Sequence, residues 1–112
     1  MHCKYTERNN DMINNSDDVN KLKCNLMEMF RDELPVLRAK GRLSQENVSE
    51  KIGISRQTYN GIETGKREMN WTTFLALVAL FQNNEHTKQM IEQMDGFNEG
   101  MIKIIESSEV KI

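Results

Sequence analysis

The sequence lacks the features that mark several large classes of protein. It has one proline, two cysteines and two histidines in 112 residues, and no apolar run approaches the roughly 20 residues that a membrane-spanning helix needs. No apolar stretch of the secretory-signal kind follows Met1. The spacing of Cys3 and Cys24 fits neither a redox motif nor a zinc motif. We therefore expect a cytoplasmic protein that does not enter a membrane.

Groups for catalysis are also missing. The sequence shows no nucleophile–base constellation, no glycine-rich phosphate loop and no paired carboxylates of the acid–base kind. The side chains that could be imagined as a metal set, His2, Cys3, Cys24 and His86, have no ligand spacing. These absences predict that the protein is not an enzyme and that it uses no metal and no cofactor.

Charge is distributed unevenly along the chain. The net charge of −2 does not by itself favour nucleic acid. Residues 31–70 hold eight basic and six acidic side chains, whereas the rest of the chain holds seven basic and eleven acidic ones. Because salt screens charges beyond about 10 Å, this mildly basic middle segment permits DNA binding without demonstrating it.

The first part of the chain changes from polar to amphipathic. Residues 1–21 are rich in Asn and Asp, and we expect a flexible arm there, because such a segment buries too little surface to offset its ordering entropy. From Leu22 apolar residues recur at helical spacing until Pro35 interrupts them. Proline suits the first turn of a helix better than its interior. Rather than a kink, we expect a restart that gives a helix over about residues 33–40, closed by Gly41.

Three polar residues mark the starts of three helices. Ser44, Ser55 and Asn70 each stand between apolar residues in the pattern of an N-cap, where a side-chain oxygen accepts a hydrogen bond from a free backbone amide. Gly53 and Gly65 follow the first two of these helices and suit the left-handed conformation that ends a helix. Two short helices joined by a tight glycine turn predict a helix-turn-helix.

The C-terminal part carries most of the remaining apolar residues. Residues 71–81 are apolar nearly all round, which predicts a helix covered on more than one side. Two shorter helical patterns follow within residues 83–112. They either cover the core of a domain that spans residues 22–82 or form the interface of a homodimer, and we favour the homodimer. The fold class is therefore all-α, a compact bundle of about five to six helices.

The segment from Leu43 to Lys66, LSQENVSEKIGISRQTYNGIETGK, resembles the repressor and Cro family of phage and bacterial regulators, often called the XRE family. The resemblance covers roughly residues 34–81 and implies a lambda-repressor-like helix-turn-helix domain that binds DNA. Ser49 stands where this family usually has alanine, and Tyr59 stands where an aliphatic residue is commoner. We expect the Tyr59 ring to be partly accommodated and its hydroxyl to reach water or phosphate.

The resemblance also implies a set of DNA contacts, with the second helix of the motif in the major groove. Arg56, Gln57 and Asn60 would read base edges, since arginine forks onto guanine while Gln and Asn pair with adenine. Gly61 would keep the backbone close to the groove. Gln45, at the start of the preceding helix, would brace the side chain that reads the base. Contacts with the DNA backbone, which set register without reading sequence, are implied for Gln45, Ser55, Thr58, Tyr59, Thr64, Lys66 and Arg67. For Lys66 and Arg67, plain solvent exposure is an equally good interpretation.

The resemblance further implies an ion pair between Arg38 and Glu63 that ties the first helix to the end of the reading helix. The function that follows is a sequence-specific transcriptional regulator, in the first place a repressor, with double-stranded DNA and a second copy of the chain as partners. Two alternatives remain. One is an antitoxin that binds a protein partner through the N-terminal arm or the C-terminal helices, and the other is an interaction module that has lost DNA binding.

Overall fold

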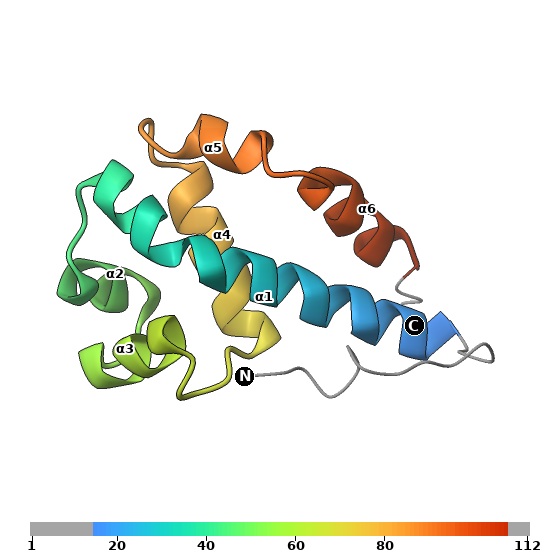
Figure 1. Cartoon of the computed structure of the whole chain (residues 1–112), viewed down its shortest axis with the longest axis horizontal. Helices are drawn as coiled ribbons and strands as arrows, with labels where there is room; N and C mark the ends of the chain where they lie inside the picture. Colours follow the sequence, from blue (N-terminus) through green and yellow to red (C-terminus); the bar gives the residue numbers. More distant parts are fainter. Residues whose placement is uncertain (1–14, 108–112) are drawn as a thin grey trace.

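A computed structural model describes residues 15–107, and the helices in this range form a single bundle (Figure 1). No strand occurs among the described residues, so the fold is all-α, as the sequence predicted. The six helices are α1 (Asn15–Gly41), α2 (Gln45–Ile52), α3 (Arg56–Thr64), α4 (Trp71–Gln82), α5 (Lys88–Glu92) and α6 (Phe97–Ser107).

Helix α1 runs through Pro35 without a restart, so the expectation of a helix that begins there is wrong. Proline removes one hydrogen bond within the helix, at a cost of roughly 3 kcal/mol. The same face of α1 buries Phe30, Leu34 and Leu37 on both sides of the proline, and each is fully buried. Burying side chains of this size stabilises by about 1.5–3 kcal/mol each, which offsets the cost of the proline, and Pro35 itself faces solvent.

The start of α1 also differs from the boundary expected for the N-terminal arm. The helix begins at Asn15, so residues 15–21 are helical and do not belong to an arm. Val19 and Leu22 are partly buried against the hydrophobic core, because α6 packs against α1 and gives this part of the chain an apolar partner. The rest of the expected arm, residues 1–14, lies outside the described residues.

The three expected N-caps are confirmed. The side chains of Ser44, Ser55 and Asn70 each accept a hydrogen bond from the backbone amide three residues later, at the starts of α2, α3 and α4. The two expected C-caps are confirmed as well, since Gly53 and Gly65 have φ angles of 85° and 83°. The left-handed conformation costs other L-residues roughly 1–2 kcal/mol, so glycine lets the chain reverse direction within a few residues at both points.

The core is continuous from α1 to α6. Phe30 of α1 packs edge-on against Phe74 of α4, with ring centroids 5.5 Å apart, and stacks on Phe97 of α6 at 5.7 Å. A side chain added at Gly100 of α6 would meet Leu26 of α1 at 3.1 Å, so the two helices approach closely there. Helices α5 and α6 therefore cover the core of the helix-turn-helix part.

The arrangement leaves α2 and α3 accessible. Figure 1 shows them on one side of the long helix α1, while α5 and α6 lie on the other side. Within residues 15–107, none of the helices combines the length and the apolar character that crossing a bilayer requires.

Candidate nucleic-acid interface

Helices α2 and α3 meet at a tight turn that fixes their relative direction. The backbone amides of Gly53 and Ile54 both donate to the carbonyl of Ser49, at 2.9 and 3.0 Å. These two hydrogen bonds to one carbonyl close the last turn of α2. The next residue, Ser55, is the N-cap of α3. Ser49, which stands where the family usually has alanine, is buried, and its hydroxyl donates to the carbonyl of Glu46 at 2.9 Å. The hydroxyl therefore has a partner although it is buried.

Helix α3 has one anchored face and one exposed face. Tyr59 and Ile62 are buried in the core, with 0% and 2% of their surface exposed. Arg56, Gln57 and Asn60 are exposed, and their spacing places them along one side of the helix. The structure therefore brings together the three side chains proposed to read bases, on a helix whose opposite face is buried in the core.

The absence of a side chain at Gly61 has a structural reason within the protein. A Cβ added there would lie 3.2 Å from the Cβ of Arg67, which is closer than ordinary van der Waals contact. The backbone amide of Arg67 also donates to the Gly61 carbonyl at 3.0 Å. Glycine makes room for the segment that returns along α3, and its expected approach to DNA remains a prediction.

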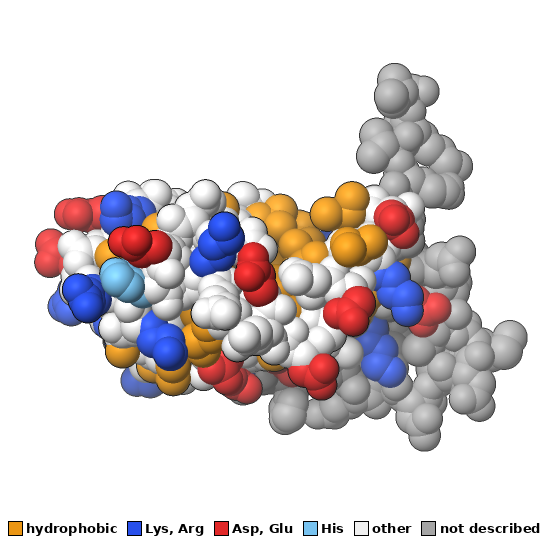
Figure 2. Space-filling view, turned by 90° about the horizontal axis from the view of Figure 1, so that it is seen from above, with side chains coloured by type: hydrophobic (Ala, Val, Ile, Leu, Met, Phe, Trp, Pro, Cys, Tyr) orange, Lys and Arg blue, Asp and Glu red, His pale blue; other side chains and the backbone are white. Residues whose placement is uncertain are grey.

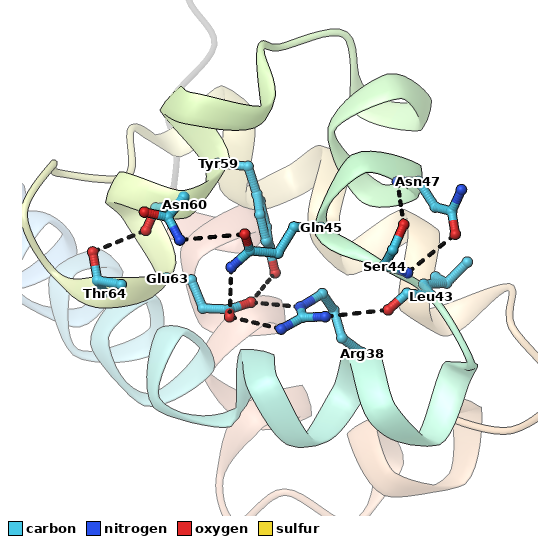
Figure 3. A network of polar contacts seen from close by, with 9 residues as sticks. All are labelled: Arg38, Leu43, Ser44, Gln45, Asn47, Tyr59, Asn60, Glu63 and Thr64. Atoms are coloured by element: carbon cyan, nitrogen blue, oxygen red, sulfur yellow. Dashed lines mark hydrogen bonds and ion pairs between the residues drawn. The ribbon is translucent and has the colours of Figure 1, made fainter.

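Arg38 and Glu63 form the expected ion pair between α1 and α3. Arg38 Nε donates to Glu63 Oε2 at 2.8 Å and Arg38 Nη2 donates to Oε1 at 2.9 Å, a two-pronged contact (Figure 3). The Glu63 side chain is 8% exposed and that of Arg38 is 22% exposed. Arg38 Nη1 also donates to the carbonyl of Leu43 at 3.3 Å, so this one guanidinium joins α1, the α1–α2 connection and α3.

Tyr59 is buried in the core, which corrects the expectation that its hydroxyl reaches water or phosphate. Its ring is fully buried, and its hydroxyl donates to Glu63 Oε2 at 2.6 Å. The ring fits because the core accepts it where the family usually places an aliphatic side chain, and the Glu63 carboxylate, instead of water or phosphate, satisfies the hydroxyl. We therefore remove Tyr59 from the proposed DNA contacts.

Gln45 connects this buried network to the exposed face. Its Nε2 donates to Glu63 Oε1 at 3.1 Å, and its Oε1 accepts from Asn60 Nδ2 at 3.2 Å. Figure 3 shows the resulting chain of contacts from Arg38 through Glu63 and Gln45 to Asn60. The bracing role that the resemblance implies for Gln45 thus has a specific target, Asn60, which the sequence did not identify.

The network shifts the pKa values of its members. Burial would raise the pKa of Glu63, but hydrogen bonds from Arg38, Tyr59 and Gln45 outweigh it and lower that pKa below its usual range. Burial raises the pKa of Tyr59, and its hydrogen bond to the Glu63 carboxylate raises it further. The hydrogen bond to Glu63 likewise raises the pKa of Arg38. At neutral pH Glu63 is therefore an ionised acceptor surrounded by donors.

The remaining residues proposed for DNA-backbone contact lie around α3. The Ser55 hydroxyl accepts from the Thr58 amide at 3.0 Å and donates to the Thr58 hydroxyl at 2.9 Å, which leaves the Thr58 proton available. The Thr64 hydroxyl donates to the Asn60 carbonyl at 2.9 Å, so a phosphate would compete for that proton. Lys66 and Arg67 are exposed.

One basic residue near the site was not expected from the sequence. Arg31 of α1 lies against the end of α3, with its Nη1 3.3 Å from where a Cβ would stand at Gly65. Its distance along the chain hides this proximity from any local pattern. Within residues 15–107, no group of three or more His, Cys, Asp or Glu side chains is placed to hold a metal ion.

Comparisons with known proteins agree with this geometry. A helix-turn-helix family model matches residues 37–83, which span the end of α1 through α4. Residues 37–83 are thus similar to helix-turn-helix domains. Over 47 residues the chain is 36% identical to YqaE of Bacillus subtilis (strain 168), described as an uncharacterised HTH-type transcriptional regulator. The similarity to YqaE covers 42% of this chain and 40% of that relative, so the chain matches less than half of the relative's length. No solved structure gives a significant match.

Proposed function

We propose that the protein is a sequence-specific DNA-binding transcriptional regulator that places α3 in the major groove. The observation that carries this proposal is the exposed polar face of α3, backed by a buried face that holds the helix in place. The chemistry of that face suits base edges: Arg56 matches guanine O6 and N7, while Gln57 and Asn60 match adenine N6 and N7. The helix-turn-helix domain and the regulator named among its relatives support the same function.

Residues around α3 would hold the protein in register on the DNA backbone. Lys66 and Arg67 supply positive charge beside the helix, and the one acidic side chain of α3, Glu63, is neutralised by Arg38. The proposed backbone contacts carry no sequence information but contribute affinity that falls with salt. They are Gln45, Ser55, Thr58, Thr64, Lys66 and Arg67.

Selection from a pool of randomised duplexes tests the proposal. The wild type should enrich a motif, and the triple variant Arg56→Ala, Gln57→Ala, Asn60→Ala should lose it. A matched control replaces three exposed residues of α5 and the turn after it, Gln89, Glu92 and Gln93, with alanine, and it should enrich the wild-type motif. If the folded wild type enriches nothing, the proposal is wrong, and an interaction module that has lost DNA binding becomes the better interpretation.

We also propose that the protein acts as a homodimer, because one reading helix covers only a few base pairs and specific operators usually present two half-sites about 34 Å apart. The candidate interface is on α6, where Ile102 and Ile105 are 54% and 67% exposed. Figure 2, which looks onto the side of α5 and α6, shows hydrophobic side chains gathered on this face. A second copy is the partner that a two-fold operator requires.

Sedimentation velocity tests the homodimer. The wild type should sediment as a dimer at micromolar concentration, and Ile102→Glu with Ile105→Glu should sediment as a monomer. Val36→Glu is the matched control, since Val36 is an exposed apolar residue of α1, 46% accessible, and this variant should remain a dimer. A monomeric wild type that still selects a two-fold motif would rule out this interface.

The finer role that we propose is repression by occupying a promoter, in the cytoplasm where a bacterial regulator meets its DNA. A reporter whose promoter contains the selected motif tests this role. Expression should fall when the wild type is present and return with the triple variant. Increased expression would show that the protein is an activator.

A further inference from the structure

We propose that Glu63 and Gln45 set the direction of the hydrogen bonds at Asn60 and thereby make Asn60 select adenine. This inference rests on the proposed function, since it concerns which base the exposed face of α3 reads. It follows from the order of donors and acceptors along the network. It means that Glu63, a member of the buried ion pair, contributes to the choice of base.

The Glu63 carboxylate fixes the orientation of the Gln45 amide. An ionised carboxylate accepts hydrogen bonds and donates none, and Arg38 and Tyr59 already donate to both of its oxygens. Gln45 therefore has to present its Nε2 hydrogens to Glu63, as observed at 3.1 Å. A reversed Gln45 amide would place its carbonyl oxygen against a carboxylate oxygen.

The Gln45 amide in turn fixes the orientation of the Asn60 amide. Because the Gln45 nitrogen faces Glu63, its carbonyl oxygen faces Asn60 and accepts from Asn60 Nδ2 at 3.2 Å. One hydrogen of the Asn60 amide is used in this way. The second hydrogen and the Oδ1 acceptor remain, and Asn60 is exposed on the face proposed to meet DNA.

The remaining pair of groups matches one base better than the others. In the major groove adenine offers an N6 donor beside the N7 acceptor, which complements an outward carbonyl and one N–H. Guanine offers two acceptors on its N7 and O6 edge, thymine offers one acceptor and a methyl group, and cytosine offers only its N4 donor, so each of them pairs with just one of the two free Asn60 groups. An Asn60 amide turned the other way would present its N–H groups to those acceptors, so the fixed direction disfavours guanine and thymine relative to adenine.

The experiment compares base preferences at the Asn60 position by selection followed by binding to single-base variants of the selected site. Asn60→Ala first identifies that position as the one where base preference is lost. Gln45→Met then removes both amide contacts while keeping the length of the side chain. We expect the preference for adenine to fall from roughly tenfold or more to within about threefold, with preferences at the other positions unchanged.

Two further variants separate positioning from a general loss of binding. In an Asn60→Ala background, Gln45→Met should change no base preference, because nothing remains to be positioned. Glu63→Gln should broaden the same position to accept guanine or thymine, because a neutral amide can present either its oxygen or its nitrogen to Gln45. Thermal melting of each variant confirms that the protein compared is folded.

The outcomes distinguish this inference from the proposed function. If the wild type selects a motif and folded Gln45→Met keeps the full adenine preference, the positioning role is wrong while DNA reading stands. A uniform loss of affinity across all sequences would also overturn it, since that result assigns Gln45 only to phosphate contact. If the folded wild type selects no motif, both the proposed function and this inference fail.

Discussion

Glu63 occupies the centre of the polar network. Its two carboxylate oxygens accept hydrogen bonds from Arg38, Tyr59 and Gln45, with donor–acceptor distances of 2.6 to 3.1 Å. No buried side-chain nitrogen or oxygen in the described part of the chain is left without a partner. A buried carboxylate with this many donors is stable only as a set, because removing a donor exposes part of the cost of burying the charge.

Replacing Tyr59 with phenylalanine tests its place in this set. The ring remains buried, and the 2.6 Å hydrogen bond to Glu63 is lost. Hydrogen bonds to charged groups contribute about 1.5–3 kcal/mol, so the free energy of unfolding measured with urea should fall by about that amount. Affinity for the selected DNA site should not change, measured under conditions where both proteins are folded. A large loss of DNA affinity would return Tyr59 to the contact surface.

The lowered pKa of Glu63 predicts a dependence of stability on pH. The unfolded pKa is about 4.3 and the folded pKa is lower, so the ionised form is favoured by folding. Its contribution is fully present above the unfolded value and is lost as the pH falls through the folded value. The difference in unfolding free energy between the wild type and Glu63→Gln should therefore shrink on acidification below about pH 4.3. A difference that stays constant down to pH 2 would contradict this assignment.

At the scale of elements, the short helices depend on their ends. Helices α2 and α3 have 8 and 9 residues, which is too short for stable helices in isolation. Capping serines start them, left-handed glycines end them, and the buried faces against α1 and α4 supply the remaining stability. The helix-turn-helix is therefore a local design that requires the long helices as a support.

Gly53 offers a test of the turn between α2 and α3. It has a φ angle of 85°, and a Cβ added there would meet nothing within 4 Å, so alanine would pay only for its backbone conformation. Gly53→Ala should lower the free energy of unfolding by about 1–2 kcal/mol, measured by urea denaturation. Gly53→Asn is the control and should lose less, because asparagine tolerates this conformation better. Equal losses from both would mean that the strain lies elsewhere.

At the scale of the whole molecule, net charge and local charge differ. The chain carries −2 overall, yet Lys66 and Arg67 lie exposed beside α3, and Glu63 is paired. Because charge acts over roughly 10 Å at ordinary salt, the surface near α3 determines attraction to phosphate. An acidic protein with this distribution is compatible with a DNA partner.

Salt dependence tests this local charge. Replacing Lys66 and Arg67 with alanine should weaken binding by a similar factor on every sequence and should flatten the slope of log affinity against log salt by about 1.8, or roughly 0.9 per lost phosphate contact. Fluorescence anisotropy over a range of salt concentrations measures the slope. Glu46→Ala with Glu50→Ala is a control that also alters exposed charges nearby on α2, and it should not reduce the slope. An unchanged slope for the first variant would assign both residues to solvent.

Interactions between near neighbours in the chain could be predicted from the order of residues alone. Ser44, Ser55 and Asn70 cap their helices through amides three residues away, and Gly53 and Gly65 end helices by their own backbone freedom. These interactions lie within one helical turn, so the order of residues is enough to predict them. The helix-turn-helix and the all-α fold class followed from them, and the motif's resemblance to a known family added the proposed contacts and the ion pair.

Features that join residues far apart in the chain could not be predicted from the order of residues and are seen in the fold. Helix α1 continues through Pro35 because the core buries Phe30 and Leu37 on either side of it. The Tyr59 ring is buried because its hydroxyl donates a hydrogen bond to Glu63, which is held in place by its ion pair with Arg38. The link from Gln45 to Asn60 joins residues 15 positions apart on different helices. In each case the deciding free energy comes from burial or from a partner that packing brings close, and no local pattern contains that information.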